Sequence, residues 1–417
     1  MPTVIQICVE GNRGSTGRIA EGIGVAAMAR GWKSYIAYGR FPRPSRSSLI
    51  RIGSQMDVWV HGLQTRLLDR HCLGSKSATK KLVGEIVRLK PDIVHLHHLH
   101  GYYINIKILF DFLSKSRIPI VWTFHDCWAL TGHCAYFSFA RCDRWMSACY
   151  SCPQRREYPA SYLIDRSRPN YSEKKALFTS AERMTIIPAS QWLDEIVGRS
   201  FLAGFPRRVI NNGVDLGIFK PAEIAPKSIN GLKIGDRFLL LGVANTWGTR
   251  KGLKDFIRLS EIISDREVIV LVGLNGSEIK RLPNNIIGLA RTESQQQLCD
   301  LYGAAGAFLN PTWEDNFPTT NLEALACGTP IITYKTGGSV EAVSDGTGYV
   351  VEQGDIAGLY RAVETIKSIG KEAFSSACRE RAVKFYNKDD RYADYVDLYG
   401  EIMEGPRPDD VTASPSD

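Results

Sequence analysis

The chain has 417 residues, more than one hydrophobic core usually fills, so two domains are expected. Its hydrophobic content of 44% and charged content of 23% are those of an ordinary soluble globular protein, and no apolar run is long enough to span a bilayer. The start, MPTVIQICVEGNRG, enters a strand-like run without the basic segment and cleavage site of a secretory signal, which predicts a cytoplasmic protein.

The net charge of +8 hides an asymmetry, because the first half of the chain is the basic one. Residues 1–215 contain 30 Lys and Arg against 16 Asp and Glu, whereas the remainder contains 22 against 28. A basic face fits nucleic acid, an anionic membrane surface or a phosphorylated substrate. The cations are scattered and follow neither an RNP-type aromatic motif nor a helix-turn-helix pattern, so no nucleic acid is expected. Contact with membrane or phosphate is preferred, and a solvated surface without function stays open.

Strand-like and helix-like runs alternate along the first half. The sequence predicts strands over residues 3–10, 34–39, 91–97, 118–126 and 184–190, and helices over residues 18–30, 106–116 and 191–198. Strands separated by helices predict a parallel doubly wound sheet.

The turn between the first strand and the first helix, EGNRGSTGRIA, has glycines at positions 11, 14 and 17. They permit close approach of the backbone to a ligand and leave helix N–H groups directed at an anion. The spacing is not G-x-G-x-x-G, and the next strand ends without the acidic residue that would bind an NAD ribose, so a dinucleotide dehydrogenase is disfavoured. The turn predicts phosphate or sugar-phosphate contact, with a purely structural tight turn as the alternative.

Four histidines are grouped in VHLHHLHG at the end of a predicted strand: His95, His97, His98 and His100. We expect acceptor contacts there rather than a metal site, because His95 and His97 alternate along the strand and no carboxylate lies nearby at ligand spacing.

Four cysteines follow in HCAYFSFARCDRWMSACYSCP, within an insertion over about residues 127–153: Cys134, Cys142, Cys149 and Cys152. In a cytoplasmic protein such a set, ending in C-x2-C, suffices for one tetrahedral structural zinc. Free thiols packed in a loop, or redox-labile pairs, are the alternatives.

After a looser segment over residues 222–236, which is predicted to be a linker, the strand pattern starts again. Strands are expected over residues 237–244, 267–273, 286–290, 306–311, 330–334 and 348–351. A last helix is expected over residues 389–404, crossing back to the first domain. The chain is thus predicted to be α/β, with two Rossmann-like domains over residues 1–215 and 216–388 and a cleft between them. Residues 405–417 are expected to be a disordered tail.

The stretch DNFPTTNLEALACGTP predicts a short helix between two strands of the second domain. Pro318 suits the first helical position, and Gly328 with the proline that follows it is a stop signal. Strand, loop, helix and strand form a βαβ unit, which places ligands at the carboxyl ends of its strands. Asp315 lies on this loop and Glu323 lies eight positions later, off the apolar stripe. A solvated surface carboxylate is the alternative for Glu323.

Two further clusters lie at strand ends of the second domain. Arg250 and Lys251, in ANTWGTRKGLKDFI, precede a helix, where paired cations would neutralise a diphosphate. Gly337 and Gly338, in YKTGGSVEAV, open another helix and offer backbone N–H groups to an anion. Either cluster by itself could be an exposed turn, but together with a mid-helix carboxylate they indicate a ligand site.

The motifs DNFPTTNLEALACGTPIITYKTGGSVEAV, NTWGTRKGLKDF, INNGVD and FHD resemble those of the retaining glycosyltransferases of family 4, over nearly the whole chain. Those enzymes have the GT-B fold, two Rossmann-like doubly wound parallel-sheet domains facing across a cleft. VHLHHLHGYY and the cysteine-rich segment are similar to the branch that makes colanic acid and capsular polysaccharide. The resemblance implies transfer of a sugar, with retention of configuration, from a nucleotide-sugar donor to a growing, lipid-linked glycan acceptor. It also implies a protein peripheral to the cytoplasmic face of the inner membrane, with no cofactor required for catalysis.

The family's acidic pair falls on Asp315 and Glu323. The second carboxylate of the family typically holds the nucleotide ribose, and the first lies near the donor sugar, where this chain has the shorter Asp. The diphosphate-binding Lys falls on Lys251, with Arg250 as its partner, and the His that faces the reaction centre falls on His125. The implied nucleotide-sugar-binding residues are Gly14, Arg250, Lys251, Asn316, Phe317, Pro318, Thr319, Glu323, Gly337 and Gly338, and the implied catalytic residues are His125, Lys251, Asp315 and Glu323.

Departure of a nucleoside diphosphate builds negative charge, which preorganised cations and N–H groups stabilise better than water does. Two rival functions stay open on the same fold. A nucleotide-sugar 2-epimerase is disfavoured because such enzymes lack this lysine–glycine and acidic-helix pattern. A non-catalytic subunit that binds nucleotide sugar or glycan is kept open by Asp at position 315.

Overall fold

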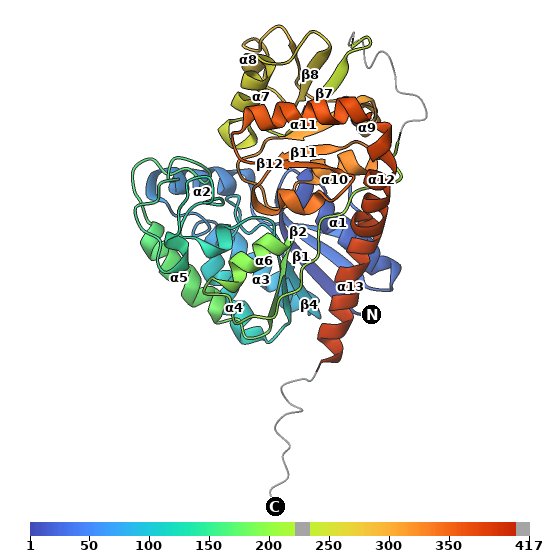
Figure 1. The fold of residues 1–417 in the computed structure, drawn as a ribbon. Coiled ribbons are helices and arrows are strands. Elements are labelled where there is room, and N and C mark those ends of the chain that lie inside the picture. The colour runs from blue at the N-terminus through green and yellow to red at the C-terminus, as the bar shows by residue number, and fades with distance from the viewer. Residues whose placement is uncertain (222–233, 406–417) are drawn as a thin grey trace, which may run out of the picture. The chain divides into compact units, whose positions relative to one another are not determined.

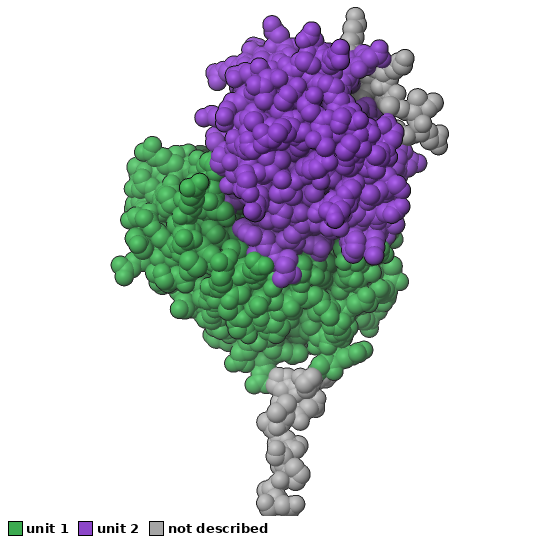
Figure 2. Space-filling model, viewed as in Figure 1, with its two compact units in different colours: residues 1–188, 194–210, 389–417 green, residues 189–193, 211–388 purple. Residues whose placement is uncertain are grey.

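The computed structural model describes residues 1–221 and 234–405, so the predicted linker and the predicted tail fall almost entirely outside the described residues. The chain divides into two compact units, coloured separately in Figure 2. The first unit comprises Met1–Pro188, Asp194–Ile210 and Asp389–Asp417, and the second comprises Ala189–Leu193 and Asn211–Lys388.

The first unit is built on a six-stranded parallel sheet in the order β3-β2-β1-β4-β5-β6. Figure 1 labels β1, β2 and β4 of this sheet. Its strands are β1 Thr3–Glu10, β2 Lys33–Arg40, β3 Ser48–Arg51, β4 Ile93–Leu96, β5 Ile120–Phe124 and β6 Met184–Pro188. Its helices are α1 Gly14–Ala29, α2 Gln55–Leu68, α3 Lys76–Leu89, α4 Ile106–Ser116 and α5 Ser167–Thr179, with short 3-10 helices η1 Trp128–Leu130 and η2 Arg144–Met146; helix α6 spans Gln191–Gly198. The strand order reverses between β1 and β4, which is where open α/β sheets bind ligands.

The last helix, α13 (Lys388–Glu404), belongs to the core of the first unit. Tyr395, Val396 and Tyr399 pack in one buried cluster with Val4 and other residues of this unit. The hydroxyl of Tyr399 also lies 2.6 Å from Nδ1 of His95, in the middle of the sheet. Helix α13 therefore completes the hydrophobic core of the unit that contains β1.

The second unit repeats the same architecture with its own six-stranded parallel sheet, in the order β12-β11-β10-β7-β8-β9. Its strands are β7 Phe238–Val243, β8 Glu267–Val272, β9 Ile286–Leu289, β10 Ala307–Asn310, β11 Ile331–Tyr334 and β12 Gly348–Val351. Its helices are α7 Leu253–Ser260, α8 Gly276–Ile279, α9 Gln295–Ala304, α10 Thr319–Ala326, α11 Ile356–Ile369 and α12 Glu372–Tyr386, with 3-10 helices η3 Thr249–Lys251 and η4 Gly337–Ala342. Here the strand order reverses between β7 and β10.

The predicted parallel, doubly wound sheets are thus confirmed in both units. The central strands β5, β8 and β10 are buried at every position, as expected for parallel strands covered by helices on both faces. Across residues 1–221 and 234–405, no helix is both long enough and apolar enough to cross a membrane.

Candidate active site

Helix α10 carries the predicted ribose-binding carboxylate, and its ends are set by local backbone chemistry. Pro318 is the N-cap residue, with φ −69° and ψ 119°, so the helix begins at Thr319. The prediction that Pro318 takes the first helical position was therefore wrong by one residue. Gly328 ends the segment with φ +70°, a conformation that L side chains rarely adopt, and a Cβ there would lie 2.3 Å from Ser375 Oγ. The predicted stop at Gly328 is confirmed.

Lys251 and Asp315, which the sequence predicted separately, form an ion pair at the ends of neighbouring strands of the second sheet. Their side chains are 22% and 14% exposed, so both are largely buried yet open to a ligand. Arg250 lies beside them and donates from Nη1 to the main-chain oxygen of Glu314 at 2.7 Å. The structure therefore brings both predicted cations to the loop that carries Asp315.

Gly337 and Gly338 pack directly against the same loop. A Cβ added to Gly337, which has φ +50°, would lie 1.9 Å from the main-chain oxygen of Asp315. At Gly338 a Cβ would lie 1.9 Å from the main-chain oxygen of Asn316. Neither position can accept a side chain, and the helix that they open, η4, is a 3-10 helix. Both glycines are therefore needed to bring the turn against the Asp315 loop.

Glu323 lies half-buried on α10, outside the stripe of buried residues on that helix. Its Oε2 accepts a hydrogen bond from the hydroxyl of Tyr302 at 2.9 Å. Burial, and then the Glu323 carboxylate itself, raises the pKa of Tyr302 well above its usual value, so the phenol stays protonated and acts as the donor. The carboxylate is thus fixed from the protein side, as a ribose-binding group needs to be.

The remaining predicted binding residues of this loop stabilise its shape. Asn316 Oδ1 accepts from Ser190 Oγ at 2.5 Å, and Phe317 is only 4% exposed and packs against the ring of Tyr386. Sequence reasoning missed Asn321, a fully buried residue that bonds Asn310 at 2.8 Å and so ties α10 to β10. A polar residue inside an apolar helical stripe was the feature that could have revealed it.

In the first unit, the predicted glycine turn leads into α1. Gly14 has φ +65°, and a Cβ there would lie 2.7 Å from Glu10 Oε2. The helix begins at Gly14, and its N-cap residue Arg13 makes no side-chain cap hydrogen bond. A glycine at position 14 is thus required by the backbone conformation of the turn.

His125 is held by a chain of three hydrogen bonds. Gln6 donates from Nε2 to Ala20 O at 2.7 Å, which turns its Oε1 toward His97 Nε2 at 3.0 Å. His97 Nε2 must therefore carry a proton, and its bare Nδ1 accepts from His125 Nε2 at 3.2 Å. Burial, followed by the neighbouring His98, lowers the pKa of His125 well below its usual value. His125 is thus a neutral imidazole with its proton on Nε2.

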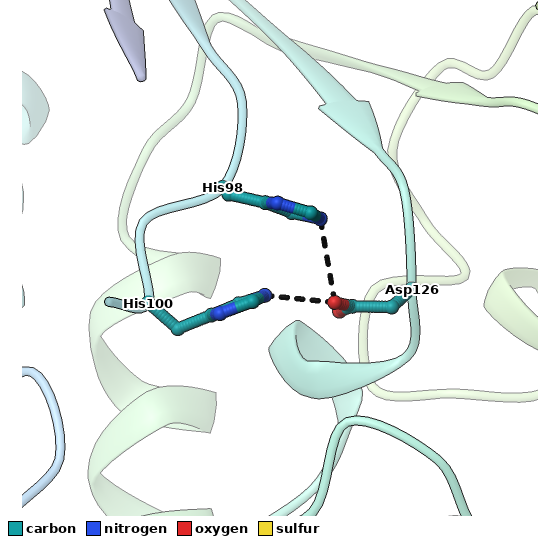
Figure 3. Close-up of side chains that lie close together, drawn as sticks. All are labelled: His98, His100 and Asp126. Atoms are coloured by element: carbon teal, nitrogen blue, oxygen red, sulfur yellow. Dashed lines mark hydrogen bonds and ion pairs between the residues drawn. The ribbon is translucent and has the colours of Figure 1, made fainter. Parts of the chain in front are cut away.

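His98, His100 and Asp126 form a second cluster at the carboxyl ends of β4 and β5 (Figure 3). Asp126 Oδ2 lies 2.7 Å from His100 Nε2 and 3.4 Å from His98 Nε2. On the far side of each ring, Nδ1 lies near a hydroxyl: Thr16 Oγ1 at 3.2 Å for His98, and Tyr158 OH at 2.9 Å for His100. The expectation that no carboxylate lies near these histidines was wrong, because the pairing of β4 with β5 places Asp126 beside them.

This cluster offers one carboxylate and two imidazoles to a ligand. Burial by itself would raise the pKa of Asp126, but the His100 and His98 imidazoles outweigh burial and hold it well below its usual range. Burial lowers the pKa of His100, against the opposing effect of Asp126. Asp126 is therefore an anion that accepts a hydrogen bond from the neutral imidazole of His100. His98 is the most open of the three, with its side chain 23% exposed.

The four predicted zinc ligands lie in the segment between β5 and α5. Cys134 and Cys149 are buried, while Cys142 and Cys152 are half-buried. All four line one small cavity. Zinc binding there stays a prediction.

Family models match both halves of the chain. The model described as Glycosyltransferase Family 4 matches residues 17–217, and the one described as Glycosyl transferases group 1 matches residues 237–368. The protein named colanic acid biosynthesis glycosyl transferase WcaC, of Escherichia coli (strain K12), is 22% identical over 388 residues, which cover 91% of each chain. A D-inositol 3-phosphate glycosyltransferase of Mycobacterium sp. (strain KMS) is 28% identical over 190 residues, 42% of this chain and 43% of that one.

Solved structures share the fold at low identity. Sucrose-phosphate synthase of Thermosynechococcus elongatus gives a TM-score of 0.73 at 16% identity, covering 97% of this chain and 100% of that one. HepE of Anabaena, solved with UDP-glucose, gives a TM-score of 0.67 at 15% identity and covers 96% of this chain and 99% of that one. The two parallel sheets described above are thus those of the GT-B fold.

Proposed function

Because this chain belongs to the glycosyltransferases of family 4, we propose that it transfers a hexose-type sugar from a nucleotide-sugar donor to a growing polysaccharide or oligosaccharide, with retention of anomeric configuration. The observation that carries the proposal is the grouping of the Lys251–Asp315 ion pair with Gly337 and Gly338 at one edge of the second sheet. A cation and a carboxylate at strand ends suit a ligand with both phosphate and sugar.

The second unit would bind the donor. Lys251, with Arg250 beside it and the η4 backbone opposite, stabilises the diphosphate as it departs and gains charge. Glu323, fixed by Tyr302, accepts hydrogen bonds from the ribose hydroxyls, and Asp315 faces the sugar. Support comes from HepE, a neighbour of the same fold that was solved with UDP and with UDP-glucose.

The first unit would bind the acceptor and supply His125. With its Nε2 proton directed to His97, His125 has Nδ1 left as an acceptor for a sugar hydroxyl. The Asp126 anion and the partly open His98 offer further hydrogen bonds to the hydroxyl groups of a glycan. In a same-face mechanism the leaving phosphate takes the acceptor proton, so no dedicated general base is required of these residues.

We also propose that the protein is peripheral to an anionic membrane, where a lipid-linked acceptor resides. Helix α2 is apolar on its outer face as well as its inner one. That outer face, here called the α2 apolar face, consists of Met56, Trp59, Val60, Leu63 and Leu67, at helical spacing and all exposed. Trp59 is 65% exposed, which is unusual for a free surface.

The surroundings of the α2 apolar face are basic. Arg40 and Arg66 share a groove with Trp59 and Leu63 on one side of the helix. Arg70 and Lys76 share a groove with residues of the same helix on its other side. An apolar stripe flanked by cations is the pattern of a helix that lies in the interface of an anionic bilayer. WcaC, the relative that matches over most of its length, carries a name from the biosynthesis of a polysaccharide.

The test is incubation of the full chain with a panel of labelled nucleotide sugars, with and without lipid-linked glycan acceptors. Transfer with retained configuration, established by NMR of the product, supports the proposal. An epimerised donor would instead indicate an epimerase, and tight donor binding without transfer or hydrolysis would indicate a non-catalytic subunit.

A further inference from the structure

The segment between β5 and α5 buries some of its large side chains although it has little regular structure. From Cys127 to Arg166 it contains only two 3-10 helices, of three residues each. Yet Trp145 is 2% exposed and Phe137 is 5% exposed. Irregular segments of this length inside a compact domain are uncommon unless they carry a function or are fastened by something other than a hydrogen-bonded ladder.

Four thiols and one imidazole of this segment surround a single small cavity. Cys134, Cys142, Cys149, Cys152 and His133 line it, and its volume is about 10 Å³, which suits one ion rather than an organic ligand. The thiols of Cys134 and Cys152 are hydrogen-bonded to each other. Cys149 Sγ accepts the main-chain N–H of Gly132 at 3.2 Å.

His133 lines this cavity, and one of its two ring nitrogens has no hydrogen-bond partner among the described residues. Its side chain is 0% exposed, and its Nδ1 lies 2.6 Å from Asp69 Oδ1. Asp69 is itself fixed, since its Oδ2 accepts the main-chain N–H of Arg166 at 2.7 Å. His133 Nε2 is buried and has no hydrogen-bond partner among the described residues. A buried ring nitrogen without a partner is costly and indicates that something is meant to occupy the cavity.

Lys174 supplies a second, independent indication. Its ammonium is buried, with 3% exposure, and donates to Trp128 O at 2.7 Å and to Thr131 O at 2.9 Å. Within residues 1–221 and 234–405, no carboxylate forms an ion pair with it. Burial lowers its pKa to about 8, and it interacts electrostatically with Cys72, Cys149 and Cys134 and with Asp126. A buried cation beside thiols is expected where those thiols are anions.

We propose that Cys134, Cys142, Cys149 and Cys152 bind one Zn²⁺ as four thiolates, with His133 and Lys174 as the polar groups around it. Binding releases four thiol protons, so the centre carries a charge of about −2. His133 lines the same cavity with its buried Nε2, while its Nδ1 lies 2.6 Å from Asp69 Oδ1. Lys174 offsets part of the negative charge.

No three of the four sulfurs lie within 4.8 Å of one another, so they are spaced more widely than a zinc sphere requires. Among the described residues, only His98, His100 and Asp126 form a group of three ligand atoms within 4.8 Å of one another. The cysteine side chains must therefore rotate inward as the metal binds, which side chains on an irregular segment can do. The cluster in Figure 3 is the competing location for a metal, and the experiment has to separate the two.

The experiment uses the full chain, expressed without a polyhistidine tag in zinc-supplemented medium. We expect about one equivalent of zinc per chain, released on modification of thiols by a mercurial reagent. Replacement of the zinc by Co²⁺ should give the intense visible and near-ultraviolet bands of a tetrahedral thiolate site. Zinc well below one equivalent, or Co²⁺ bands of an octahedral nitrogen and oxygen site, would overturn the proposal.

Variants locate the metal. Cys142→Ser, at one of the two half-buried cysteines, should abolish stoichiometric zinc, whereas Cys8→Ser, at a buried thiol of β1 outside the segment, should retain it. The double variant His98→Asn, His100→Asn should also retain zinc. Loss of zinc in this double variant would place the metal at the Asp126 cluster and refute the thiolate site.

If Cys142→Ser fails to fold, His133→Gln keeps all four thiols and should release zinc to a chelator faster than the unmodified protein. Equal release rates would contradict the role of His133.

Zinc content and zinc release are measured without an assay of sugar transfer. A negative result for zinc would therefore not count against the proposed transferase activity. A negative result for sugar transfer would likewise not count against the zinc site.

Discussion

Nδ1 of His97 lies 3.2 Å from Nε2 of His125, and the opposite nitrogen of His97 lies 3.0 Å from Gln6 Oε1. The orientation of the Gln6 amide is set in turn by its donation to Ala20 O in α1. A residue on β1 thus fixes which nitrogen of His125 carries the proton. Gln6 is a positioning residue for His125, and its effect on the reaction can be separated from its effect on folding.

We predict that Gln6→Met lowers kcat by about tenfold, since loss of one buried hydrogen bond is worth roughly 1.4 kcal/mol here, while KM for the donor changes little. Steady-state kinetics check this. The matched control is Thr123→Val, which removes the 2.8 Å contact of Thr123 Oγ1 with His95 Nε2 in the same sheet. It should lower the melting temperature but leave kcat unchanged. Equal kcat in both variants would show that the Gln6 chain is only structural.

Glu323→Gln keeps the size of the side chain and replaces a charged acceptor by a neutral one. Because charge-assisted hydrogen bonds are worth roughly 1.5 to 3 kcal/mol, kcat/KM should fall by about tenfold to a few hundredfold. The melting temperature should barely change, since the side chain lies outside the buried stripe of α10. Tyr302→Phe, which removes the 2.9 Å contact but keeps the charge, should cost less in kcat/KM. A large drop in melting temperature with transfer intact would identify a structural carboxylate.

Lys251→Ala and Asp315→Asn should have different effects although the two residues are ion-paired. Lys251→Ala should lower kcat/KM at least as much as Glu323→Gln, because the departing diphosphate loses its cation. Asp315→Asn should reduce transfer while the nucleoside diphosphate still binds, and binds more tightly, since Lys251 is no longer shared with a carboxylate. Isothermal titration calorimetry with the diphosphate distinguishes them. Loss of diphosphate binding in Asp315→Asn would contradict the assigned role.

We predict that protonation of His61 lowers the free energy of unfolding at acid pH. His61 is 1% exposed, its Nε2 accepts the N–H groups of Cys72 at 3.0 Å and Gly74 at 3.4 Å, and burial lowers its pKa to about 4. The unfolded chain binds the proton more tightly, so the stability present above about pH 6.5 is lost as the pH falls toward 4, by roughly 3 kcal/mol in total.

Urea unfolding at several pH values in this window checks the His61 prediction. His61→Gln keeps an acceptor for the backbone but cannot titrate, so its stability should fall less steeply over the same range. Other buried histidines act in the same direction, and the comparison of the two proteins isolates His61. Parallel curves for the two proteins would refute the prediction.

The α2 apolar face predicts membrane binding with both an electrostatic and an apolar component. Binding to anionic liposomes should fall steeply with salt, each nearby Lys or Arg contributing at most about 1 kcal/mol. Trp59→Ser should weaken binding by roughly tenfold or more, because a buried aromatic side chain is worth about 1.5 to 3 kcal/mol. Val87→Ser, at an exposed residue of α3 outside this face, is the control. Equal binding to neutral vesicles would refute the electrostatic component.

The sequence predicted the sheets well because buried parallel strands leave continuous apolar runs, as in β5 and β8. It did not predict α2, since the exposed Trp59 and Leu63 blur the contrast between an inner and an outer face. Asp126 was missed as a partner of His98 because the two are adjacent only through the pairing of β4 with β5. The same holds for Asp69 and His133, which lie 64 residues apart and meet only in the fold. Contacts between strand ends require the strand order, which local patterns do not contain.

The placement of α13 in the first unit has a consequence for how the protein is made. Residues 389–404 emerge from the ribosome only after the second unit has been synthesised, yet Tyr395 and Tyr399 complete the core around Val4 and His95. At 5–20 residues per second, synthesis of residues 211–388 takes roughly 10–40 s, during which the N-terminal sheet lacks part of its covering. The second core is not complete before this interval ends, because Phe374, Cys378, Ala382 and Tyr386 of α12 belong to it. An α13 deletion should therefore leave the N-terminal sheet exposed to chaperones and proteases.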